Sequence, residues 1–125
     1  MALAFILLAP ILIGCVDLGR AYFAYDILVH GVNEGVRVGT YTSDTATIVA
    51  TVRDAAATLN LQSEDVDVTC YSGATTTTKT CTSMVTGDSV QVGANVLFTP
   101  ITPLIANLLP GGTLTVGATA KRSFQ

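Results

Sequence analysis

The sequence is poor in the residues on which chemistry usually depends. It has no tryptophan, one histidine (His30) and three cysteines, and charged residues make up only 12% of the chain. The usual charged share is about 25%. Because few residues could form a catalytic or metal site, we expect no enzyme activity, no metal and no cofactor. The low charge also predicts that much of the surface is covered, by lipid or by copies of the same chain.

Clusters of basic residues are missing as well. The six lysines and arginines are scattered among nine acidic residues, and the net charge is -3. Proteins that bind nucleic acids carry basic patches that neutralise phosphates. We therefore expect no nucleic-acid partner.

Charge is absent from residues 1–16, and the first charged residues are Asp17 and Arg20. As a helix this segment is about 24 Å long, slightly shorter than the core of a bilayer. It can be a signal-peptide core, a marginal membrane helix or a helix buried in an assembly. Secretory signals normally begin with lysine or arginine, so we expect that a basic leader is missing or was removed.

The helical pattern continues past residue 16 and shows no break before Gly39. Opposite charges recur three or four residues apart; these pairs are Asp17–Arg20, Asp26–His30 and Glu34–Arg37. We predict one helix of nearly forty residues. Pro10 has no N–H to donate, so a kink or local opening is expected near residues 6–14. The alternative to surface pairs is that these charges form a proton relay.

Three glycines, Gly31, Gly35 and Gly39, recur every four residues on one face of this helix. Glycine costs a helix roughly 1 kcal/mol relative to alanine. This spacing therefore indicates that another backbone approaches closely, as in packing between small residues.

Residues 40–125 are predicted to form a separate small head, which divides the chain into a helix (1–39) and a globular part (40–125). Ser43 or Asp44 can cap a second helix, and period-two alternation indicates strands. The expected elements are helices at about 45–60 and 104–109, and strands at 66–70, 81–85, 90–98 and 114–120. The predicted fold class is α+β, with a small antiparallel sheet of about four strands.

The cysteines suggest different roles. Cys70 and Cys81 flank a threonine-rich loop, and outside the cell they would form a disulfide; the alternative is two unpaired thiols. Cys15 ends Leu12-Ile13-Gly14-Cys15, which matches the bacterial lipobox. The absence of a basic segment before it and the helical pattern after it favour the alternative, a small buried hydrophobic residue. The loop itself contains possible acceptors for O-linked sugar, or it is a solvated turn; they are Thr75, Thr76, Thr77 and Thr78.

Four segments carry a family resemblance. They are Phe5 to Pro10 followed by Gly14-Cys15-Val16-Asp17-Leu18-Gly19-Arg20-Ala21-Tyr22, then Asn33-Glu34-Gly35-Val36-Arg37, then Phe98-Thr99-Pro100-Ile101-Thr102-Pro103-Leu104, and the closing strand Leu114 to Arg122. In this order they resemble TadE-like pilins of the tight-adherence (Tad/Flp) type IV pilus system. The family usually has a glutamate shortly after its cleavage point. Here none occurs before Glu34, and Ala4 or Phe5 occupies that neighbourhood.

The resemblance implies a type IV pilin-like structural subunit that forms a homo-oligomeric helical filament and serves in adhesion. It implies cutting by a prepilin peptidase, an inner-membrane intermediate, the pilus assembly machinery and a final location in an extracellular pilus. The residues expected to matter for assembly are Phe5, Pro10, Gly14, Asp17, Arg20, Gly31, Gly35 and Gly39. The rival hypotheses are an extracytoplasmic binding module, membrane-anchored or lipidated at Cys15, and a secreted enzyme.

Overall fold

The computed structural model describes the backbone of residues 2–125 and the side-chain surroundings of residues 8–125 except residue 104. The helices are α1 (Ala2–Gly39), α2 (Thr45–Ala55) and α3 (Pro103–Leu108), with short 3-10 turns η1 (Ala57–Leu59), η2 (Ser63–Asp65), η3 (Cys81–Ser83) and η4 (Pro110–Gly112). The strands are β1 (Val66–Tyr71), β2 (Thr78–Lys79), β3 (Ser89–Phe98) and β4 (Leu114–Ser123). They form one antiparallel sheet in the order β2-β1-β3-β4. The predicted α+β class is confirmed.

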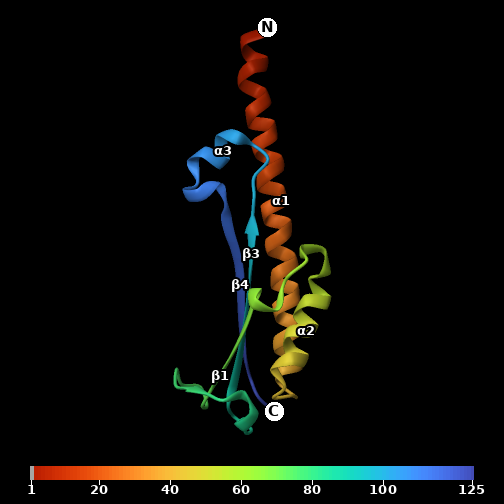
Figure 1. Ribbon diagram of the computed structural model, residues 1–125, viewed down its shortest axis with the longest axis vertical. Coiled ribbons are helices and arrows are strands. Elements are labelled where there is room, and N and C mark those ends of the chain that lie inside the picture. Colours follow the sequence, from red (N-terminus) through yellow and green to blue (C-terminus); the bar gives the residue numbers. More distant parts are fainter. Residues whose placement is uncertain (1) are drawn as a thin grey trace.

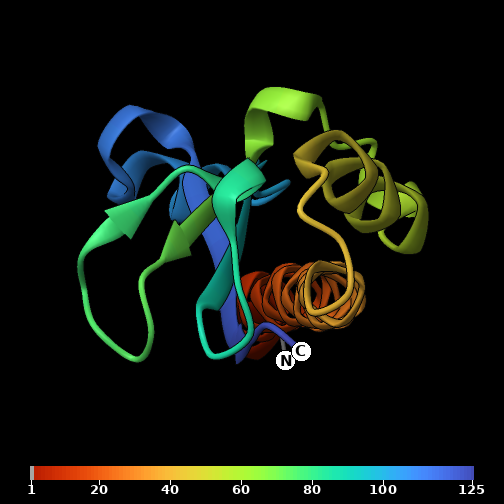
Figure 2. The same cartoon turned by 90° about the horizontal axis from the view of Figure 1, so that it is seen from below.

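The long helix α1 defines the shape of the molecule. Its N-terminal part projects beyond the head, and its C-terminal part lies against the sheet and α2 (Figure 1). The helix continues without interruption past Pro10, so the local opening expected at residues 6–14 is not observed. Seen from below, α2 and the sheet lie on adjoining sides of α1 (Figure 2).

One core joins α1 to the head. Leu28, Val32 and Val36 lie four residues apart on α1, so they share one face and are fully buried. That face meets α2 on one side and the inward-facing residues of β3 on the other; these are Ile48, Val52, Ala56, Val90, Val92 and Ala94. The boundary at residue 39 is therefore the end of a helix, and it does not separate two hydrophobic cores.

Local chemistry accounts for the second helix. The Asp44 carboxylate accepts the backbone N–H of Ala46 at 3.2 Å and caps α2, as the sequence predicted. The helix ends at Ala55, earlier than residue 60, because its last turn tightens into η1. The chain then reverses at Asn60, whose φ of 51° is left-handed, a conformation that asparagine tolerates better than most residues.

One predicted strand is wrong. Residues 81–85 contain η3, and the short strand that pairs with β1 lies before them, with Cys70 opposite Lys79. The reason is the buried carboxylate of Asp88. It accepts the N–H of Val85 at 2.9 Å and binds the Lys79 ammonium at 2.7 Å, which folds this segment into turns.

Candidate functional site

Between residues 8 and 25, a range that includes the projecting N-terminal segment (residues 8–16), α1 carries large apolar side chains that the head does not cover. The large side chains that stay exposed there are Leu8, Ile11, Leu12, Ile13, Val16, Leu18, Tyr22, Phe23 and Tyr25. Ile11, Leu12 and Ile13 are consecutive, so they point about 100° apart and reach different sides of the helix. The apolar surface therefore surrounds this part of α1. Pro10 is also exposed, and the side chain of Phe5 lies outside the described residues.

A clasp between Asp17 and the start of α3 fixes the head to this helix. The Asp17 carboxylate accepts the backbone N–H of Ile101 at 3.1 Å, the backbone N–H of Thr102 at 2.8 Å and the Thr102 hydroxyl at 2.6 Å. Asp17 is only 3% exposed. These bonds join two segments that are more than 80 residues apart in sequence, and they hold α3 beside the projecting helix (Figure 1).

At neutral pH the clasp consists of hydrogen bonds to an ionised carboxylate. The bond from the Thr102 hydroxyl, and after it the N–H of Ile101, lowers the pKa of Asp17 from 3.8 to about 2. Burial opposes this, and the charge of Arg20 adds a smaller favourable effect. The Arg20 guanidinium lies 3.4 Å from Asp17 and 5.3 Å from the centre of the Phe98 ring, so a half-exposed cation accompanies the buried carboxylate.

Sequence reasoning missed this role of Asp17 and did not single out Thr102. The sequence predicts Asp17 as an assembly residue and as part of a surface pair or a proton relay. The pair with Arg20 exists, but most hydrogen bonds of Asp17 are with the loop after β3. A signal was present in the sequence. Asp17 is the first charge after a long apolar run, and Thr102 lies in a polar interruption of an otherwise apolar segment between two prolines. A lone buried carboxylate needs hydrogen-bond donors, and such a segment supplies them.

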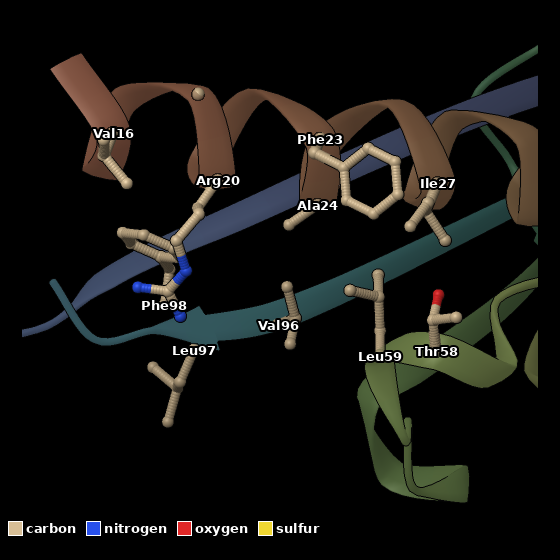
Figure 3. Close-up of a pocket in the computed structure, with 11 residues that line it drawn as sticks. Val16, Arg20, Phe23, Ala24, Ile27, Thr58, Leu59, Val96, Leu97 and Phe98 are labelled. Atoms are coloured by element: carbon tan, nitrogen blue, oxygen red, sulfur yellow. The ribbon is translucent and has the colours of Figure 1, made fainter. Parts of the chain in front are cut away.

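An apolar groove, called here the α1 groove, lies beside the clasp and has a volume of about 510 Å³. One wall is α1 from Val16 to Ile27, and the other is formed by Val96 of β3 and by Leu59 of η1 (Figure 3). Val96 and Leu59 point toward the helix, whereas Leu97, next in the strand, points away from it (Figure 3). Among the described residues that line the groove, Arg20 is the one that carries a charge.

The three glycines meet the protein's own head. A Cβ built on Gly31 would lie 3.2 Å from the carbonyl oxygen of Val52, and one on Gly39 would lie 3.1 Å from Val90. At Gly35 an added Cβ would overlap the Val52 side chain. The expected close approach of another backbone is therefore present at Gly31 and Gly35, but α2 of the same chain makes it, and Gly39 faces side chains of β3 and α2. Gly14, nearer the N-terminus of α1, lies against Ile105 of α3.

The other charges on α1 do not form a relay. Glu34 and Arg37 form the predicted pair, with Nη2 of Arg37 2.7 Å from the glutamate. Asp26 and His30 are both exposed, and no ion pair joins them in the part of the chain that the structure describes. Within residues 2–125 no cluster of His, Cys, Asp and Glu has the arrangement of a metal site.

The loops at the other end of the head contain the disulfide. Cys70 and Cys81 are bonded, as predicted, and Cys15 is a free, exposed thiol on α1. The four threonines Thr75–Thr78 are all exposed. Asp88 organises these loops, because it also accepts the N–H of Gly73 at 3.0 Å. Its pKa is lowered to about 2, chiefly by the bond from Lys79.

Comparison with known proteins connects the chain with one family. The family model described as TadE-like protein matches residues 1–37, which cover most of α1, including Asp17 and Arg20. No curated protein and no solved structure gives a significant match. The family match links the chain to the Tad pilus system and to a pilus-associated location, extracellular or at the membrane. No helix in the described part of the chain is long and apolar enough to cross a membrane.

Proposed function

We propose that this chain, which is TadE-like over residues 1–37, is a structural pilin subunit that assembles with copies of itself into an extracellular pilus filament. It acts by assembly and not by catalysis. The observation that carries the proposal is the uncovered apolar surface of the projecting part of α1. The inner-membrane stage, the prepilin peptidase and the assembly machinery are further parts of the proposal, and they rest on the family resemblance.

A helix that is apolar on all sides is normally buried. Ile11 is 62% exposed, Leu12 58% and Leu18 68%, although burying such a side chain is worth about 1.5–3 kcal/mol. Every copy of the chain presents the same surface. Packing the projecting helices together in a central bundle would therefore cover them, and the heads would form the outer shell.

The clasp and the glycine contacts support a structural role. Gly31 and Gly35 let α2 approach α1 closely, and Asp17 ties α3 to the helix. Head and helix are thereby joined at two levels along α1. When the helices pack, each head is carried at a fixed position relative to its own helix, as a regular filament requires.

A pair of matched substitutions tests the proposal. Leu12→Glu places a charge on the projecting helix, and Leu108→Glu makes the same change on α3 of the head, where the leucine is 77% exposed and does not line the α1 groove. Both side chains are exposed, so neither change should unfold the monomer. Burying an unpaired carboxylate between helices is strongly unfavourable. Leu12→Glu should therefore abolish filaments seen by negative-stain microscopy, and Leu108→Glu should leave them.

The opposite pattern would overturn the proposal. If Leu108→Glu abolished filaments and Leu12→Glu did not, contacts between heads would drive assembly, and α1 would have another role. Circular dichroism of both variants serves as the control that the fold is retained.

A further inference from the structure

The α1 groove has no partner within the molecule, although its walls are apolar. We propose that it binds the projecting helical segment, residues 8–16, of a second copy of this chain. This inference rests on the proposed assembly function and names the contact that would create it. Three properties of the structure support it: the continuity of α1, the charge of the groove and its length.

The first argument is that a molecule cannot fill its own groove. α1 is one continuous helix, Ala2–Gly39, and the groove begins at Val16. Residues 8–15 therefore lie beyond the end of the groove on the same continuous helix and cannot turn back into it. The segment and the groove can meet only in different molecules. Because such a contact joins two different patches, it propagates into an open helical assembly unless the rotation closes a ring.

The second argument is charge. Arg20 is the charged residue of the groove, and its guanidinium is already engaged by Asp17 at 3.4 Å and by the Phe98 ring. An occupant with its own charge would bury that charge without a counterpart, which is costly. Residues 8–16 carry no charge, whereas the exposed face of α2 carries Arg53 and Asp54. The chain's own projecting segment is therefore a chemically suitable occupant.

The third argument is length. From Val16 to Ile27 the helical wall of the groove is about 16 Å long, and residues 8–16 span about 12 Å. Subunits of a polar filament run parallel, so the middle of the segment, near Leu12, would lie beside the middle of the wall, near residue 21 or 22. This places contacting copies about 14 Å apart along the helix axis. At the edge of the groove, a Cβ on Gly19 would meet nothing within 4 Å, which leaves room for a second helix.

Cross-linking of the assembled full-length protein tests the contact, because Cys15 is a native exposed thiol in the segment. Thr58→Cys and Phe23→Cys place a second thiol on each wall of the groove, at exposed positions. Asn95→Cys is the matched control, since Asn95 is exposed and adjoins Val96 on β3 but lies on the opposite face of the sheet. Each assembled variant is treated with a short bismaleimide, and the products are separated under denaturing conditions.

We expect both groove variants to give a ladder of covalent multimers, because each chain would be linked through Cys15 to one neighbour and through the groove to another. The yield of trimers and larger species should exceed that of Asn95→Cys several-fold. Replacing Cys15 by serine should abolish the ladder.

Filaments that form normally without a ladder in either groove variant would refute the groove contact and leave the proposed function intact. An equally strong ladder with Asn95→Cys would refute it as well. If neither wild type nor any variant assembled, the proposed function itself would be wrong, and the groove contact with it.

Discussion

Alanine at Gly35 and alanine at Gly19 should change the stability of this protein in opposite directions. Both glycines lie in α1, where replacing glycine by alanine gains roughly 1 kcal/mol of helix propensity. At Gly19 a Cβ meets nothing within 4 Å, so most of that gain should be realised. At Gly35 a Cβ overlaps the Val52 side chain and lies 3.5 Å from Val92.

Overpacking of a core typically costs about 1–3 kcal/mol. After the gain in propensity, Gly35→Ala should destabilise the protein by about 0–2 kcal/mol, and Gly19→Ala should stabilise it by up to about 1 kcal/mol. The two variants are thus expected to differ by about 1–3 kcal/mol. Replacing Gly35 by leucine should be worse than by alanine, since more atoms must be placed in the same space.

Thermal and urea unfolding of the protein in mild detergent, followed by far-ultraviolet circular dichroism, measures these differences. A double-mutant cycle with Val52→Ala adds a stringent test, because the smaller side chain should remove the overlap and reduce the penalty at Gly35. Equal stabilisation by both alanine substitutions would refute the packing of α1 against α2 described here. Strict additivity of Gly35→Ala and Val52→Ala would do the same.

Three further predictions concern the clasp and the cysteines. Asp17→Asn should loosen α3 at neutral pH, which would be seen as faster amide exchange at Ile101 and Thr102, and the control Asp26→Asn should not. Because folding lowers the pKa of Asp17 from 3.8 to about 2, the stabilising effect of its carboxylate is present above pH 4 and is lost between about pH 4 and pH 2. If the stability of the wild type did not fall toward that of Asp17→Asn between pH 4 and pH 2, this assignment would be contradicted. Reducing the Cys70–Cys81 bond, which closes a loop with a sequence separation of 11, should cost somewhat less than about 3 kcal/mol, and unchanged unfolding after reduction would contradict a stabilising role. The intact mass of the protein should show Cys15 without lipid, whereas a diacyl or triacyl mass would favour the lipoprotein hypothesis. In the same spectrum, hexose-sized mass increments that map to Thr75–Thr78 would show that the threonine-rich loop is glycosylated.

Patterns that arise within one element were readable from the sequence. The long helix, the capped second helix at Asp44 and the strand around Val92 follow from the periodicity of apolar residues and from one capping side chain. The disulfide followed from cysteines that flank a polar loop. Each of these depends on residues that are close together in the chain.

Features that depend on distant residues were missed or assigned differently. The clasp joins Asp17 to Thr102, and periodicity does not reveal which segment supplies donors to a buried carboxylate. The strand expected at 81–85 is replaced by turns because Asp88, Lys79 and Val85 come together only in three dimensions. The spacing of the glycines correctly indicated a close contact, but it did not distinguish α2 of the same chain from a neighbouring subunit.

The central claim is that the projecting segment of α1, residues 8–16, holds copies of this chain together. Cryo-electron microscopy of filaments formed by the full-length protein tests it most directly, because density at side-chain resolution locates residues 8–16. We predict that these residues lie in a central bundle of helices, each in the α1 groove of a neighbouring copy, with the heads outside. Filaments in which residues 8–16 lie on the outer surface, away from other copies, would contradict the claim.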